Sequence, residues 1–176
     1  MWWLSLGLIV PLMISSSKPT LIFHKTMILC HDLYRTLGAA ELLEREKLQG
    51  DPKPLAKETY GGCVDSAGGN VLANILPLIK HSGAVACCGL AAGMPLSTTV
   101  APFILRGVTL AGVDSVFMPV DRRLAVYNKF GSILANGKLD LLSSSDKMVG
   151  LSGVLDLSQQ MLKGNVTGRY VVDVNK

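Results

Sequence analysis

Charged residues make up only 17% of this 176-residue chain, and no long run of basic residues occurs in it. Aromatic residues, at 6%, are few and do not alternate with the basic ones, so a nucleic-acid-binding pattern is missing. The formal net charge of +4 comes from scattered lysines and arginines, which we expect to lie on solvated surfaces. We therefore expect no nucleic-acid partner.

The cysteines show neither a Cys-x-x-Cys pair nor a cluster with histidine at zinc spacing. They are Cys30, Cys63, Cys87 and Cys88. Neighbouring residues of a strand point to opposite faces, so a disulfide between Cys87 and Cys88 is not expected. We predict reduced thiols that pack as small apolar residues, which indicates a reducing, cytoplasmic compartment. No metal site is predicted.

Catalytic patterns are also missing. The hydroxyls of Ser97, Thr98 and Thr99 have no partner histidine in their sequence context, and no acid, base or nucleophile has a credible spacing. The early glycine Gly7 lies in an apolar run and begins no G-x-G-x-x-G pattern. The residue pattern by itself therefore identifies no catalytic group.

The chain is rich in apolar residues, which make up 49% of it, and glycines and prolines separate its apolar segments. Residues 83–116 are typical of a buried strand, a glycine-containing loop, a connection and a second strand. The strands that we expect lie at residues 39–43, 85–88, 108–113 and 170–174, and residues 61–69 predict a further strand that ends in a tight turn. We expect the strand at 85–88 to be central and buried on both faces.

Helices are expected between these strands. The first starts at an Asn70 cap, is kinked by Pro77, and has an apolar face that includes Ile79. The second is capped by Asp121, and the third lies near residues 155–162. Residues 49–59, which contain two prolines, predict a surface loop or a short broken helix. Alternating strands and helices favour an α/β fold with a mostly parallel sheet and flanking helices.

The N-terminal segment differs from the rest. Residues 2–14 are nearly all apolar, but as a helix they would span only about 20 Å of a hydrocarbon core of about 30 Å. Pro11 interrupts the run, and no positive charge precedes it. A signal or membrane anchor is the minority interpretation, and the alternative is a start that does not match the remaining domain. Residues 19–30 fit either a strand or a helix.

Five segments, in this order, carry a family resemblance: HDLYRTLGAAELLER, GGCVDSAGGNVLANIL, CGLAAGMPLSTTVAPFILRGVTLAGVDSV, DRRLAVYNKF and KGNVTGRYVVDVN. Together they resemble the C-terminal half of the zinc-independent medium-chain dehydrogenase/reductases. The nearest branch is the YhdH-type quinone oxidoreductases, which includes acrylyl-coenzyme A reductases. The resemblance covers residues 31–175.

The resemblance implies a reductase that passes hydride from NADPH to the activated C=C bond of an enoyl thioester or to a quinone, without a metal. It divides the chain into an apolar, non-matching segment, residues 1–30, and part of an NADP-binding Rossmann domain, residues 31–176. The family's barrel-like catalytic domain, first Rossmann strand and glycine-rich turn have no counterpart in this sequence. We therefore expect a doubly wound but partial Rossmann-type fold with little activity alone.

The resemblance also implies which residues face the cofactor. None is catalytic, and the cofactor-binding residues are Ser66, Gly68, Cys88, Gly89, Leu90, Leu110, Gly112, Arg169 and Asn175. In doubly wound sheets the ligand lies across the carboxyl ends of the strands, where most of these residues are expected. For Asp65 and Asp114 we expect structural hydrogen bonds.

A second interpretation makes the chain a non-catalytic interaction module. The strand at 108–113 is an apolar edge candidate, and the corresponding edges pair across a dimer in the family. Such an edge would support a homodimer. Cofactor binding separates this interpretation from the reductase.

Overall fold

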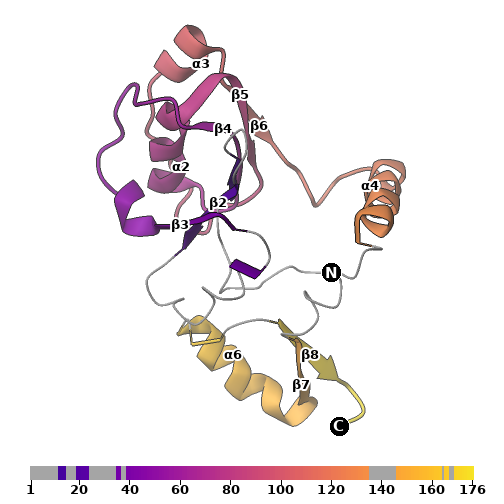
Figure 1. The fold of residues 1–176 in the computed structure, drawn as a ribbon. Helices are drawn as coiled ribbons and strands as arrows, with labels where there is room; N and C mark the ends of the chain where they lie inside the picture. Colours follow the sequence, from indigo (N-terminus) through magenta and orange to yellow (C-terminus); the bar gives the residue numbers. More distant parts are fainter. Residues whose placement is uncertain are drawn as a thin grey trace. The chain divides into compact units, whose positions relative to one another are not determined.

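The structure is a computed structural model, and it describes residues 12–14, 19–23, 35–36, 39–134, 146–163, 165–166 and 169–176. These residues form two compact units, which divide between Val113 and Asp114. The first unit contains a six-stranded sheet, and the second contains a two-stranded sheet (Figure 1).

The first unit consists, in chain order, of β1 (Leu12–Ile14), β2 (Pro19–Phe23), β3 (Glu41–Glu44), η2 (Arg45–Leu48), β4 (Tyr60–Asp65), α2 (Gly69–Ile75), η3 (Leu76–Leu78), β5 (Ile79–Cys87), α3 (Ala101–Arg106) and β6 (Thr109–Gly112). Its strand order, β3-β2-β1-β4-β5-β6, is the order of a Rossmann-type doubly wound sheet. The predicted α/β class with a mostly parallel sheet is confirmed.

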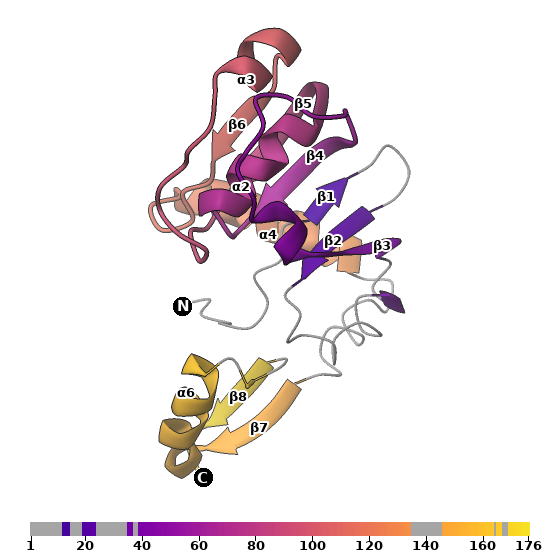
Figure 2. The same cartoon turned by 90° about the vertical axis from the view of Figure 1, so that its left-hand side faces the viewer.

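One strand departs from that pattern. β1 occupies the place of the first Rossmann strand, but it runs antiparallel to both of its neighbours, β2 and β4 (Figure 2). Only residues 15–18 join β1 to β2. A parallel connection needs a dozen or more residues, so this short link permits only the reversed direction.

The hydrophobic core lies on one face of the sheet. Val71, Leu72 and Ile75 of α2 pack there with Cys63 of β4 and Val85 of β5. Val64 follows Cys63 and Ala84 precedes Val85, so both belong to the other face of the sheet, and both are exposed. The expectation that the strand at 85–88 is buried on both faces is therefore wrong, because the described helices that reach this core cover one face only.

Two details of the first predicted helix are also wrong. The helix N-cap is Gly68, and Asn70 lies inside the first turn, where its amide donates hydrogen bonds to the carbonyls of Gln49 at 2.6 Å and Gly50 at 3.1 Å. The α-helix ends at Ile75, and Pro77 lies in the 3₁₀ turn η3. Ile79, predicted on the helix, starts β5. The chain turns at Pro77 rather than continuing as a kinked helix.

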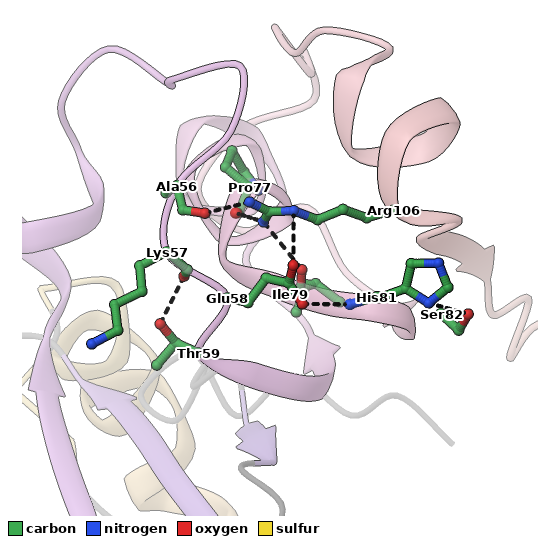
Figure 3. A network of polar contacts seen from close by, with 9 residues as sticks. All are labelled: Ala56, Lys57, Glu58, Thr59, Pro77, Ile79, His81, Ser82 and Arg106. Atoms are coloured by element: carbon green, nitrogen blue, oxygen red, sulfur yellow. Dashed lines mark hydrogen bonds and ion pairs between the residues drawn. The ribbon is translucent and has the colours of Figure 1, made fainter.

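A cluster of polar contacts joins the end of α3 to the beginning of β5 (Figure 3). The Arg106 guanidinium donates to the carbonyls of Ala56 at 2.6 Å and Pro77 at 2.7 Å, and its Nε lies 3.5 Å from a Glu58 carboxylate oxygen. The other Glu58 oxygen accepts from the backbone N–H of His81 at 2.9 Å. These contacts attach the loop at 49–59 to the amino end of the sheet.

The second unit contains α4 (Val120–Leu134), β7 (Asp146–Gly150), η4 (Leu151–Gly153), α6 (Val154–Leu162) and β8 (Arg169–Asp173). β7 and β8 pair in parallel, and β7 has no counterpart among the predicted strands. α4 begins at Val120, so Asp121 lies in its first turn and is not its cap.

Among the described helices, none has the length and apolar character needed to cross a membrane. Most of the apolar run at 2–14 lies outside the described residues.

Candidate functional site

Three parallel strands end side by side at one edge of the six-stranded sheet. Asp65 of β4 is level with Cys87 of β5, which is level with Gly112 of β6. Ser66 and Gly68 follow β4, and Cys88, Gly89 and Leu90 follow β5. The structure therefore brings six of the predicted cofactor-binding residues to one edge. We call residues 65–69 and 87–90, with Gly112, the carboxyl edge.

Glycine is required at the centre of the carboxyl edge because two backbone segments nearly touch there. A Cβ atom on Gly89 would lie 2.3 Å from the carbonyl oxygen of Ser66. Gly68 has a φ of +64°, and a Cβ atom there would lie 2.9 Å from the carbonyl oxygen of Gly93. Neither position accepts a side chain without displacing backbone. The two turns thus form one continuous backbone surface.

Asp65 lies directly beneath this surface and is 0% exposed. One carboxylate oxygen accepts the N–H of Gly68 at 2.8 Å, and the other accepts the N–H of Ala67 at 3.3 Å. Its main-chain carbonyl accepts the N–H of Cys88 at 2.7 Å. Burial raises the pKa of the carboxyl group, while the hydrogen bonds from Gly68 and Ala67 act in the opposite direction. The structural role expected for Asp65 is confirmed.

The described thiols in and near the carboxyl edge are free and weakly acidic. Cys63, Cys87 and Cys88 are all unpaired, as predicted, whereas Cys30 lies outside the described residues. The Cys88 thiol donates to the Asp65 carbonyl at 3.2 Å, and burial raises the pKa of each thiol. A raised pKa disfavours the thiolate, so none of these three is an activated nucleophile. The described residues contain no group of three or more metal-ligating side chains.

The remaining predicted residues have different surroundings. Leu110 lies inside β6, level with Val85, and its side chain packs against the hydrophobic core. Arg169 begins β8, and the backbone N–H of Asn175 donates to an Asp173 carboxylate oxygen at 3.0 Å. Both belong to the second compact unit. Their roles at a cofactor, and that of the Leu110 backbone, stay predictions.

A shallow pocket beside the Gly68 turn was not predicted. It has a volume of about 240 Å³ and is lined by Gly69, Asn70, Ala92, Gly93, Pro95 and Ser97. The N–H of Ala92 donates to the carbonyl of Ala67 at 2.6 Å, and Gly68 pairs with Gly93 in an isolated parallel bridge. The Gly-x-Pro sequence at Gly93 indicates a turn, but nothing local shows that this turn reaches the carboxyl edge.

The strand order, the parallel strands β4, β5 and β6 and the glycine turns at their carboxyl ends define a Rossmann-type doubly wound fold. A family-model search gives no match. A curated acrylyl-CoA reductase, AcuI of Ruegeria pomeroyi, is 41% identical over 145 residues, which are 82% of this chain and 43% of that protein.

Two solved structures are similar to this chain in both sequence and fold. Escherichia coli YhdH with bound NADPH is 34% identical, with a TM-score of 0.77 over 88% of this chain and 46% of that one. Bacillus subtilis yhfP with NAD bound is 36% identical, with a TM-score of 0.76 over 87% of this chain and 46% of that one.

Over the matched residues this chain is therefore similar to acrylyl-CoA reductases and YhdH-type quinone oxidoreductases, and the predicted resemblance is confirmed. It spans a little under half the length of these relatives.

Proposed function

We propose that the carboxyl edge binds a nicotinamide dinucleotide, NADPH in preference to NADH, in an oxidoreductase that reduces an activated C=C bond or a quinone. For an acrylyl-CoA-like thioester, NADPH would supply a hydride to the β-carbon and the solvent a proton to the α-carbon, leaving NADP⁺ and a saturated thioester. Ser66, Gly68, Cys88, Gly89, Leu90 and Gly112 would line the cofactor. The observation that carries the proposal is the pair of abutting glycine turns at aligned strand ends.

The reversed β1 limits what the described sheet offers. In a doubly wound sheet the first strand ends at the carboxyl edge, and the turn after it presents a helix N-terminus to the pyrophosphate. Here β1 ends at the opposite edge, and residues 15–18 lead directly into β2. We therefore expect this chain to bind NADPH weakly and to show little turnover by itself.

The test is a fluorescence titration of the purified chain with NADPH and NADH, with NADPH oxidation followed in the presence of acrylyl-CoA or a quinone. We expect saturable binding that favours NADPH and little oxidation. Absence of saturable binding would overturn the proposed cofactor site, and rapid oxidation would overturn the expected lack of turnover.

A matched pair of variants localises the binding. Leu90 at the carboxyl edge and Leu105 on α3 are similarly exposed, at 60% and 63%. Leu90→Asp adds a negative charge where the anionic cofactor would lie, so it should weaken NADPH binding by about tenfold. Leu105→Asp should leave the affinity unchanged. Equal effects of the two variants would place the cofactor elsewhere.

Self-association is the second candidate function. β6 is the end strand of the six-stranded sheet and pairs on one side only, with β5. Its residues Ala111 and Gly112 are exposed, and Ile104 on the preceding helix α3 is 73% exposed. An open strand edge, together with exposed apolar side chains on the same unit, favours pairing with a second copy.

A further inference from the structure

Among the described residues, Asp65 is the charged residue whose side chain is buried. It contacts both the turn after β4 and the end of β5, which together make up most of the carboxyl edge. Its carboxylate accepts the Ala67 and Gly68 amides of the β4 turn. The same oxygen that binds Gly68 lies 3.8 Å from the thiol sulfur of Cys87, at the end of β5. Its main-chain carbonyl binds the Cys88 amide at 2.7 Å.

These bonds continue into the next loop. Ala67, whose amide Asp65 holds, accepts the Ala92 amide through its own carbonyl at 2.6 Å. Gly68 is bridged to Gly93. The Asp65 carboxylate therefore orients the turn after β4, and this turn binds the backbone of Ala92 and Gly93. No described cation forms an ion pair with Asp65, so the amides and the Cys87 thiol are the partners that offset the cost of burying it.

We propose that Asp65 is a positioning residue, which sets the β4 turn against the segment after β5 and so fixes the spacing of the two backbone surfaces that face the dinucleotide. This inference deepens the proposed function and rests on it for the identity of the ligand. Asp65 itself is fully buried, so we assign it no direct contact with the ligand. A carboxylate suits this task because its two oxygens accept from two amides at once.

The first experiment measures amide hydrogen exchange by NMR in the wild-type chain, in Asp65→Asn and in Asp51→Asn. The Asp51 variant removes the same charge from an exposed loop residue. An asparagine has one acceptor oxygen in place of two, so we expect the amides of Ala67, Gly68 and Ala92 to exchange at least about tenfold faster. Exchange at Val85, in the core of β5, should stay unchanged, and Asp51→Asn should change neither.

Equal acceleration at Val85 would show that Asp65 only supports overall stability, and unchanged exchange at Gly68 would overturn the proposal. If Asp65→Asn does not fold, Asp65→Ser, whose hydroxyl oxygen still accepts from an amide, is compared in the same way. NADPH titration of the same variants provides the second measurement, with a loss of about tenfold expected for Asp65→Asn. An unchanged affinity in that variant would overturn the positioning role. A wild-type chain that binds no NADPH contradicts the proposed function instead, and the exchange pattern still decides the role of Asp65.

Discussion

At the scale of single residues, the centre of the carboxyl edge depends on two glycines without side chains and on one buried carboxylate. Gly89 and Gly68 lie where backbone from two strand ends meets, so their lack of a Cβ atom is a steric requirement. Asp65 is hidden beneath them, and its charge acts on the turn above it. These residues shape a surface and carry no reactive group, which agrees with chemistry supplied by a cofactor.

The steric requirement at Gly89 can be tested against Gly112, which has no atom within 4 Å of the position of an added Cβ. We expect Gly89→Ala to lower the free energy of unfolding by about 2 kcal/mol or more, because backbone must move to admit the methyl group. Gly112→Ala should stay within about 0.5 kcal/mol of the wild type. Urea unfolding measures both, and equal stabilities of the two variants would contradict the close approach at Ser66.

The raised thiol pKa values predict how the cysteines react with alkylating agents. Burial raises the pKa of Cys88 above its ordinary value of 9.0, so little thiolate exists at neutral pH. In a Cys30→Ser background, we expect the exposed Cys88 to react first and the buried Cys63 last. The rate at Cys88 should keep rising as the pH increases past 9, since the thiolate is the nucleophile. A rate that levels off below pH 8, measured by mass spectrometry, would contradict the raised pKa.

At the scale of elements, helices and loops are attached to the sheet by contacts that the local sequence pattern does not predict. Arg106 looks like one of several scattered surface cations in the sequence, yet its guanidinium binds three carbonyls and one carboxylate near the amino ends of β4 and β5 (Figure 3). The Arg106 side chain is largely buried, whereas that of Glu58 is 44% exposed, so the carbonyl bonds should contribute more than the ion pair.

Replacing Arg106 tests this attachment. We expect Arg106→Ala to lower the free energy of unfolding by about 2 kcal/mol, because three largely covered carbonyls lose a charged donor. Arg106→Lys should recover only part of this stability, since an ammonium group lacks the planar fork. Arg123→Ala, at an exposed arginine of α4, is the control and should change little. Denaturant titration compares the three variants, and full recovery by lysine would show that charge alone matters.

Predictions of elements succeeded where the pattern is local. The strand at 170–174, the helix near 155–162 and the loop at 49–59 are all found, at β8, α6 and the segment before β4. The error at Ile79 arose because an apolar residue fits a helix face and a strand equally well. Ile79 belongs to β5 because it pairs with Tyr60 on the neighbouring strand β4. Helical periodicity cannot predict such a contact.

At the scale of the whole molecule, the sheet has the strand order of its relatives' fold class with one strand reversed. The reversal leaves two neighbours of β1 parallel to each other, so the rest of the sheet keeps its carboxyl edge. It also moves the end of β1 away from that edge. The described sheet thus offers backbone for part of the proposed dinucleotide site, and we expect this chain to show NADPH binding more readily than turnover.

Self-association is also a property of the whole molecule. If two copies pair through β6, Ala111→Lys should convert a dimer to a monomer, because a lysine on an edge strand opposes further pairing. Ala84→Lys, on the exposed face of the inner strand β5, is the matched control and should leave the dimer intact. Sedimentation velocity measures both variants. Dissociation by Ala84→Lys alone would assign the contact to the open sheet face, and a wild-type monomer would contradict the interaction module.

The sequence by itself determined the α/β class, most strand positions and the glycines of the two turns, because alternation, apolar runs and turn residues are local signals. The tertiary structure decided the direction of β1, the burial of the sheet on one face and the partners of Asp65 and Arg106. Each of these depends on which distant segments become neighbours. The Asp65 carboxylate shows the difference most plainly. Its place in a strand that leads into a tight turn was predicted from the sequence, but the turn and the strand end that it joins meet only when β4 and β5 pair.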